Sequence, residues 1–328
     1  MTRTLNAYAG TTPWGRSGIE VPKGTSPKDM LKASGLDWKV EKRELAVKTS
    51  KGFEPIAKKF GLVRADNDQV LSIVGQGYKP LQNSDAVDFF TDFVNAGDLE
   101  MKAIGSVRGG EYVWALAKAG ESYNIGSAKQ GDGMSNYVLL TSPHVGGKSA
   151  RAQFIATREW CWNTISLALS SGGAKGSLDG RAFRMPHSQV FGKELREKAT
   201  QALGLAIQRG ESIKQIGNKL AKVELTAAKT TKLFYKLLKV EQPTLDAIKS
   251  GDAKVPLMIQ RFEDALQKAP GAQASTAQGT AWGWLNAVTY VVDHEQGRTD
   301  DGRLYSAWFG QGASMKKHAL ELALEEAK

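Results

Sequence analysis

The chain has 328 residues, of which 41% are hydrophobic and 24% are charged, and its formal net charge at pH 7 is +10. This balance is typical of a globular protein and excludes wholesale disorder. The longest apolar runs, such as Tyr137–Leu140 and Ala287–Val292, are far shorter than the roughly 20 residues that span a bilayer. The N-terminus lacks the apolar core of a secretion signal, and the single cysteine, Cys161, cannot form an internal disulfide. We therefore expect a soluble, cytoplasmic protein.

The positive charge is concentrated in two segments of the chain. Residues 1–64 hold 13 Lys or Arg against 6 Asp or Glu, and residues 170–240 hold 14 against 5. The two other segments, 65–169 and 241–328, each have a net charge of −3. Segregated positive charge attracts nucleic-acid phosphates because binding releases their counterions. The alternative is a solvated helical face that only keeps the protein soluble.

The N-terminal part of the chain predicts an extended basic arm followed by strands and a helix. Residues 1–35 are rich in Gly, Thr, Pro and Lys and form this arm, with a short helix at Pro27–Ser34. A first strand is expected at Leu36–Val47, and a hairpin across the turn Asp66–Asn67–Asp68. The strands of that hairpin are Phe60–Arg64 and Val70–Tyr78. A helix capped by Ser84 then runs to Ala96.

The middle of the chain predicts antiparallel hairpins. Strands are expected at Met101–Val107 and Tyr112–Ala117, and the glycine-rich stretch Gly120–Gly133 reads as a loop. A second hairpin is predicted from Tyr137–Ser142 and Ala150–Thr157, around a turn at Pro143–Gly147. A helix at Arg158–Ser170 is expected to follow.

Beyond Gly173 the periodicity becomes helical. Gly172–Gly180 is a glycine-rich connector, and a basic stretch leads into helices over Phe191–Leu238. Further helices are predicted at Pro243–Lys249, Val255–Gln267, Ala281–Asp293 and Ser314–Lys328. The pattern therefore predicts an α+β fold: a core domain of curved antiparallel β-hairpins with packed helices over residues 36–173, and a mainly helical region over residues 174–328.

No motif in the sequence predicts catalysis. Gly146–Gly147–Lys148–Ser149 ends like a phosphate-binding loop, but Ser142 stands where the first glycine is needed, and a hairpin tip explains the glycines better. The four histidines have no partner at zinc-ligand spacing. Asp293, with Asp300 and Asp301 nearby, is the one acidic cluster that could hold Mg²⁺, although a solvated loop is the simpler interpretation. We therefore expect no enzyme, cofactor or metal.

The segment Lys148–Thr164 concentrates groups that suit nucleic acid. Guanidinium and ammonium groups pair with phosphates, and aromatic rings stack on unpaired bases. Whether Trp160 and Trp162 do this or belong to the core stays open. The predicted DNA-binding residues are those of this segment and of the basic connector: Lys148, Arg151, Arg158, Trp160, Arg181 and Arg184.

Several segments together resemble a known family, the phage/plasmid-like proteins that share a domain of unknown function. They read LDWKVEKREL, LVRADNDQVLSIVGQGYKPLQN, RGGEYVWALAK, YVLLTSPHVGGKSARAQFIATREWCWNTISLAL, TAWGWLNAVTYVVDHEQGR and WFGQGASMKKHALEL. The resemblance implies an origin on a prophage, phage or plasmid and a cytoplasmic location, and it brings no catalytic mechanism. The chain departs from it after His144, where Val145–Gly146 replaces a common Asp–Gly turn; this weakens any carboxylate role there.

The predicted hairpins followed by a helix are also similar to the core of single-strand annealing proteins of the RecT, Redβ and Erf type. That likeness implies a homo-oligomeric ring or filament with single-stranded DNA in a basic groove. The leading interpretation is therefore a DNA-binding protein for single-strand annealing or recombination, acting without ATP. One alternative is a non-enzymatic interaction or anti-defence protein of a mobile element. The other is a metal-dependent nuclease that uses the Asp293–Asp301 cluster.

Overall fold

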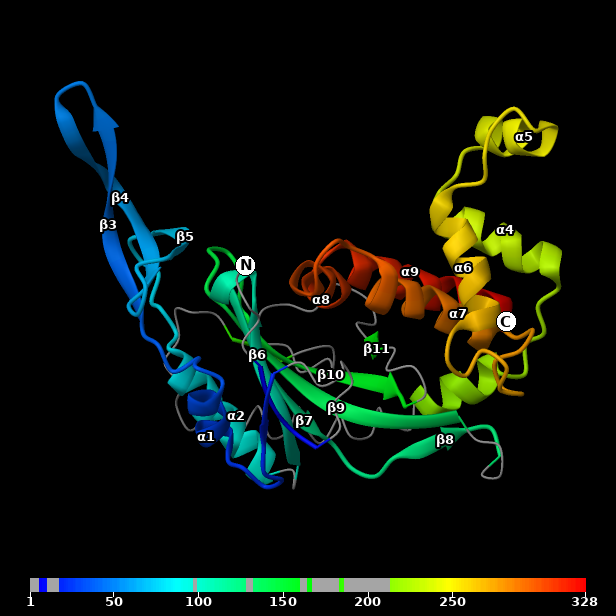
Figure 1. Cartoon of the computed structure of the whole chain (residues 1–328), viewed down its shortest axis with the longest axis horizontal. Helices are drawn as coiled ribbons and strands as arrows, with labels where there is room; N and C mark the ends of the chain where they lie inside the picture. The colour runs from blue at the N-terminus through cyan, green and yellow to red at the C-terminus, as the bar shows by residue number, and fades with distance from the viewer. Residues whose placement is uncertain are drawn as a thin grey trace. The chain divides into compact units, whose positions relative to one another are not determined.

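The computed structural model describes residues 6–10, 18–96, 99–127, 132–159, 164–166, 183–185 and 213–328, and it shows an α+β protein (Figure 1). The chain divides into two compact units. The first contains Met1–Gly120, Tyr137–Phe154 and Ser170–Gln208, and the second contains Glu121–Asn136, Ile155–Leu169 and Arg209–Lys328. Within the described residues, no helix is long and apolar enough to cross a membrane.

The larger of the two described sheets has nine strands. Its main strand order is β11-β10-β9-β7-β6-β1-β2, with β12 paired to β10 and β8 paired to β9. The pair β1–β2 is parallel, whereas β1–β6, β6–β7 and β7–β9 are antiparallel. The strands are β1 (Asn6–Ala9), β2 (Ile19–Val21), β6 (Glu100–Val107), β7 (Tyr112–Lys118), β8 (Tyr123–Ile125), β9 (Asp132–Pro143), β10 (Ala150–Arg158), β11 (Thr164–Ser166) and β12 (Phe183–Met185).

In the first unit, β6 and β7 are buried along almost their whole length. Strand β7 is accordingly apolar from Tyr112 to Ala117, whereas β6 buries Lys102 and Ser106 among its apolar residues. Helices α1 (Pro27–Ala33) and α2 (Asn83–Ala96) pack against each other, α1 against β6 and α2 against β7. The N-cap of α1 is Ser26, whose Oγ accepts a hydrogen bond from the Asp29 N–H at 3.1 Å.

The first unit also holds a separate three-stranded antiparallel sheet. Its order is β3-β4-β5, formed by β3 (Val40–Thr49), β4 (Gly52–Arg64) and β5 (Val70–Gly75). In β4, Gly52 to Lys59 are exposed, Phe60 is half-buried, and Gly61 to Arg64 are buried. The rest of β3 and β4 extends as a long hairpin.

The second unit is built around helix α7 (Ala281–Tyr290), which is buried on all sides except at Tyr290. Such a helix is apolar all round because it lies inside the core. It packs against α6 (Leu257–Lys268) and α9 (Gln311–Glu326), and it continues into a π-helical turn at Val291–Glu295. Residues 213–220 are helical. The remaining helices are α4 (Ala227–Leu237), α5 (Gln242–Ser250) and α8 (Asp300–Phe309).

The structure confirms most of the predicted elements and corrects others. The α+β class, the helices α1 and α2, and the strands β6 and β7 lie where they were expected. The loop predicted at Gly120–Gly133 is wrong in part, because β8 and the start of β9 pair there. The helix predicted at Arg158–Ser170 is wrong at Thr164–Ser166, a strand paired with β10. Helix α8 was missed because its first turn, Asp300–Asp301–Gly302, reads as a loop.

Other predictions fall outside the described residues. These are residues 160–163 and 167–170 of the predicted helix, the connector Gly172–Gly180 and the helical segment from Phe191 to residue 212; Arg158, the first residue of that helix prediction, instead ends strand β10.

A buried ion pair holds the second unit together. The Arg158 Nε donates to Asp132 Oδ1 at 2.6 Å, and the two side chains are 1% and 0% exposed. The other oxygen, Asp132 Oδ2, accepts hydrogen bonds from Trp282 Nε1 at 2.8 Å and from Thr276 Oγ1 at 3.2 Å. The guanidinium also donates to the Gly271 carbonyl at 2.8 Å. The pair therefore ties β9 and β10 to the segment before α7 and to α7 itself.

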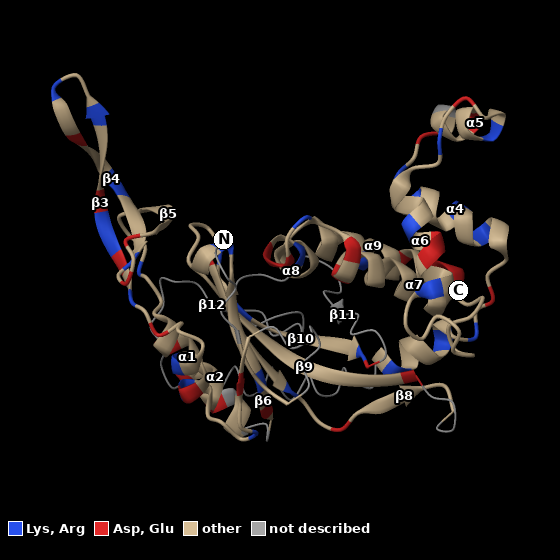
Figure 2. Ribbon diagram, in the orientation of Figure 1, with Lys and Arg blue, Asp and Glu red and all other residues tan. Residues whose placement is uncertain are grey.

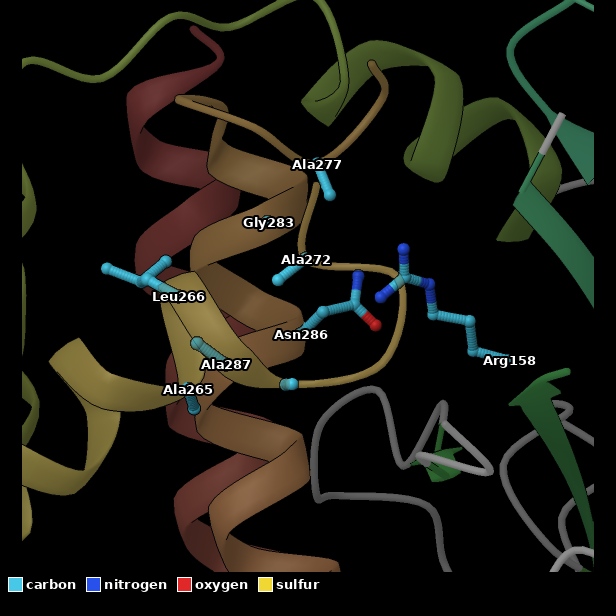
Figure 3. A pocket seen from close by; sticks show the side chains of 9 residues that line it. Arg158, Ala265, Leu266, Ala272, Ala277, Gly283, Asn286 and Ala287 are labelled. Carbon is cyan, nitrogen blue, oxygen red and sulfur yellow. The ribbon is translucent and has the colours of Figure 1, made fainter. Parts of the chain in front are cut away.

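Arg158 borders a very small pocket. Figure 3 shows its guanidinium near the side chain of Asn286, with Ala265, Ala272 and Ala287 also among the lining residues. The pocket holds about 10 Å³, enough for about one water molecule. Arg158 is thus enclosed by protein on every side that the structure describes.

We predict that Asp132→Ala lowers the free energy of unfolding by about 3–5 kcal/mol, because it leaves the Arg158 charge buried without its carboxylate. Urea denaturation followed by circular dichroism measures the loss. The control is Asp264→Ala, which removes the exposed ion pair with Lys268 and is expected to cost at most about 1 kcal/mol. Equal small losses in the two variants would contradict the prediction.

Candidate nucleic-acid interface

The most exposed element of the first unit is the hairpin formed by β3 and β4. We call residues 42–59 of these strands the basic ribbon. At its outer end, Ala46 to Thr49 pair with Pro55 to Gly52 around the two-residue turn Ser50–Lys51. Strand β5 pairs only with Lys59 to Val63 of β4. The outer part of the ribbon therefore has no third strand, and nearly all of its residues are exposed.

A large bulge separates the outer part of the ribbon from its base. The pairing passes from Glu44↔Phe60 to Ala46↔Pro55, so that four residues of β4, 56–59, lie opposite the single residue Leu45. Lys58 lies in this bulge with a φ of 60°, in the left-handed region. Bulges bend a strand and increase its twist, and here the bulge removes Lys58 and Lys59 from the pairing with β3, while Lys59 still pairs with Gly75 of β5.

The ribbon carries more positive than negative charge. Residues 42–59 include six Lys or Arg and two Asp or Glu. Figure 2 shows blue segments along both strands of this hairpin. Four of the six are exposed and form no ion pair among the described residues: Lys48, Lys51, Lys58 and Lys59. Arg43 is paired with Glu41 and Asp68, at 2.7 and 2.6 Å.

Lys42 fixes the base of the ribbon. Its Nζ lies 4.4 Å from the centre of the Phe60 ring, and it donates to the carbonyls of Gln76 and Tyr78. A cation over an aromatic face is attracted by the ring quadrupole. Lys42 is therefore held by contacts within the protein. The cations of the ribbon that are exposed and form no ion pair among the described residues are the four lysines named above.

Arg64, at the end of β4, attaches the ribbon to the sheet below it. The guanidinium donates to both carboxylate oxygens of Asp66, through Nε at 3.0 Å and Nη2 at 2.6 Å, and Nη1 donates to the Gly109 carbonyl at 3.0 Å. The central guanidinium carbon of Arg64, Cζ, lies 4.4 Å from the centre of the Trp38 ring. A Cβ on Gly110 would lie 2.8 Å from that ring, so only glycine fits there.

The turn between β9 and β10 packs beside β5. The Ser72 Oγ donates to the His144 carbonyl at 2.7 Å, and a Cβ on Gly146 would lie 3.1 Å from the Ile73 carbonyl oxygen. The His144 ring is buried and shares a hydrogen bond between Nε2 and Asn83 Oδ1 at 2.8 Å. These contacts hold the turn that presents the exposed side chain of Lys148.

The predicted DNA-binding residues lie in different environments. Lys148 is exposed and Arg151 is half-buried on β10. Arg158 was predicted to bind DNA, but its guanidinium is buried against Asp132 and does not face solvent. The Cα of Arg184, on β12, pairs in register with that of Arg151. Trp160 and Arg181 lie outside the described residues.

The four exposed lysines of the ribbon are not among the residues predicted from the sequence, because the first strand is predicted to end at Val47 and no element is predicted at residues 48–59. One signal was available. Ser50–Lys51–Gly52 is a turn sequence between two stretches that contain β-forming residues such as Val47 and Phe53. Residues 56–59 do not alternate between apolar and polar side chains, because they form the bulge and are not paired with β3.

The other candidate sites do not suit phosphate or a metal. Among the described residues, no group of three or more His, Cys, Asp or Glu is placed to hold a metal ion. Asp293 instead binds Lys316, Oδ1 to Nζ at 2.6 Å, with both side chains 3% exposed. The second unit has a pocket of about 430 Å³ beside α4 and α6, and its charged lining residue is the carboxylate Glu263.

Residues 70–308, most of the chain, match the family described as "Domain of unknown function (DUF932)". The chain belongs to this family. The matched region of this DUF932 protein begins at the first residue of β5, so the basic ribbon precedes it. No curated protein and no solved structure matches the chain.

The Arg64–Asp66 contact predicts an acid-dependent loss of stability in this DUF932 protein. The hydrogen bonds from Arg64 hold the pKa of the Asp66 carboxyl below its usual value. The pKa of Asp66 is lower in the folded state than in the unfolded state. The Arg64–Asp66 contact therefore stabilises the protein above the unfolded-state pKa of about 4, and this stabilisation is lost as the pH falls through the folded-state pKa.

We therefore expect Asp66→Asn to be less stable than the wild type at pH 6, and the difference to shrink by pH 3. Urea unfolding at the two pH values, recorded for both proteins, measures this change. A difference that stays constant between the two pH values would show that the Asp66 charge does not contribute.

Proposed function

We propose that this DUF932 protein binds nucleic acid through the basic ribbon, with single-stranded DNA as its substrate. The observation that carries this proposal is the set of four exposed lysines on the ribbon, none of which forms an ion pair among the described residues. In a charge network meant for stability, carboxylates would be expected beside these cations. Here Glu54 is the one acidic residue between residues 45 and 59.

The shape of the ribbon supports the same proposal. A two-stranded ribbon is narrow, and both of its faces are open beyond β5. Lysines spread over such an element reach successive phosphates of one strand, and each contact releases condensed counterions. Two-stranded ribbons are also one of the elements with which proteins enter DNA grooves.

The surface extends beyond the ribbon within the first unit. Lys148 lies on the β9–β10 turn that packs beside β5, and β5 pairs with the base of the ribbon. Arg151 follows on β10. We include Lys148 and Arg151 in the proposed interface and leave out Arg158, whose guanidinium is committed to Asp132. Trp160, Arg181 and Arg184 stay predictions from the sequence.

The proposed activity is annealing of complementary single strands without ATP, by a protein of phage or plasmid origin that assembles into a homo-oligomer. Its support is the sequence resemblance to phage/plasmid-like proteins. The likeness to annealing proteins adds less support, because part of the helix on which it was based is strand β11. Phosphate contacts from lysines suit this activity because they carry no sequence information and leave the pairing edges of the bases free. A nuclease based on Asp293 is less well supported, because Lys316 occupies that carboxylate.

The ribbon lysines can be tested by their effect on the salt dependence of binding. We expect the combined substitution of Lys48, Lys51, Lys58 and Lys59 by Gln to weaken binding to an oligodeoxythymidine. The slope of the logarithm of the binding constant against the logarithm of salt concentration should fall by up to about 3, since each lost phosphate contact removes about 0.7. Fluorescence anisotropy with a labelled oligonucleotide, repeated over a salt series, measures the binding constant and its dependence on salt.

The matched control replaces four exposed lysines of the second unit by Gln: Lys239, Lys249, Lys254 and Lys328. It makes the same change in net charge, and we expect the salt slope to stay that of the wild type. Equal losses in the two variants would show that net charge, not the ribbon, drives binding. A wild-type protein without single-strand preference and without salt-dependent binding would overturn the proposed function.

Annealing is tested separately with two complementary oligonucleotides, one carrying a donor dye and the other an acceptor. We expect the wild-type protein to accelerate the rise in energy transfer without ATP or Mg²⁺, and the ribbon variant to lose most of this acceleration. Binding without acceleration would keep the nucleic-acid interface and remove the annealing activity.

A further inference from the structure

The tip of the basic ribbon exposes large apolar side chains. Phe53, the second residue of β4, is 75% exposed, and Val47 and Ile56 are 51% and 41% exposed. Elsewhere in the first unit most large apolar side chains are buried in the sheet and its helices. The Phe53 ring, at the end of the hairpin, is therefore open to contact with another molecule.

The pairing of the ribbon decides which side chains share a face. Phe53 lies directly opposite Lys48, and directly opposed residues of an antiparallel pair point to the same side. Val47 lies opposite Glu54, one residue along, and these two therefore point to the other side. The Thr49 hydroxyl and Glu54 Oε1, 3.0 Å apart, agree with this assignment. One face of the tip thus combines an aromatic ring with a cation.

We infer that Phe53 stacks on an unpaired base of the bound strand, while Lys48 contacts a neighbouring phosphate. This inference rests on the proposed function and names the chemical group that the tip recognises. A base offers a flat π-surface to the ring, and its own strand carries the phosphate that the opposed lysine attracts. Lys51, in the turn, adds a second cation at the same end.

Charge and geometry favour this occupant over two others. A second copy of the ribbon would bring lysines against lysines, because residues 42–59 are net positive. An anionic membrane would attract the lysines, but an element that lies on a membrane needs one apolar face. Here Phe53 and Val47 point to opposite faces. A base inside an intact duplex is already stacked on both sides, and the ring would have to separate a base step to reach it.

The experiment compares Phe53→Leu with the wild-type full chain. Leucine keeps an apolar side chain of similar bulk and removes the ring, and the position is too exposed for the change to affect folding. We expect the affinity for an oligodeoxythymidine that carries one 2-aminopurine to fall about 5- to 100-fold. The salt slope should stay unchanged because the lysines remain. Wild-type protein should quench the 2-aminopurine fluorescence, and Phe53→Leu should lose most of the quenching, whereas Phe53→Tyr should retain it.

The outcomes separate this inference from the proposed function. If wild-type protein does not bind the oligonucleotide, both fail. If binding and its salt slope depend on the ribbon lysines but Phe53→Leu binds and quenches like the wild type, the stacking inference alone is overturned. Two other results would also overturn the stacking inference. In the first, Phe53→Leu binds the oligonucleotide normally and loses only its binding to vesicles of phosphatidylserine and phosphatidylcholine. In the second, the only defect of Phe53→Leu is a loss of self-association in analytical ultracentrifugation.

Discussion

The guanidinium of Arg64 is the constraint on which the proposed interface depends. It lies where β4 leaves the ribbon, and it joins three separate parts of the first unit: Asp66 in the following turn, the Gly109 carbonyl between β6 and β7, and the Trp38 ring before β3. A buried cation is stable only when its donors are satisfied, and two charge-assisted contacts and one carbonyl meet that need. Because the outer ribbon has no third strand, its orientation within the first unit depends on these contacts of Arg64 at its base.

Cations in this protein have two distinct roles that their count in the sequence does not separate. Arg64, Arg158 and Lys316 are almost completely enclosed, and each is neutralised by one aspartate. These pairs fix the geometry of their own unit, since a buried charge left without its partner is costly. The ribbon lysines have no such partners among the described residues. The net charge of +10 is therefore a sum over structural and exposed cations.

The sequence allows the regular part of the fold to be predicted because that part depends on local patterns. Helix α2 shows its apolar period, and β6 and β7 show apolar runs bounded by glycine. The outer ribbon leaves no such trace, because a strand with both faces open has no buried positions to alternate with. Arg158 was expected to contact phosphate because its partner, Asp132, is 26 residues away in the chain. A contact between residues so far apart in the chain leaves no local sequence pattern, so it becomes visible only in the folded structure.

The outer part of the ribbon forms hydrogen-bonded pairs only with itself, and it lies before the region that defines the family. It is therefore an appendage whose length is independent of the core. Each residue pair inserted near the turn would extend its reach by about 3.3 Å and leave the packing around Arg64 as it is. A longer hairpin of this kind would accordingly reach farther from a body that keeps the same packing.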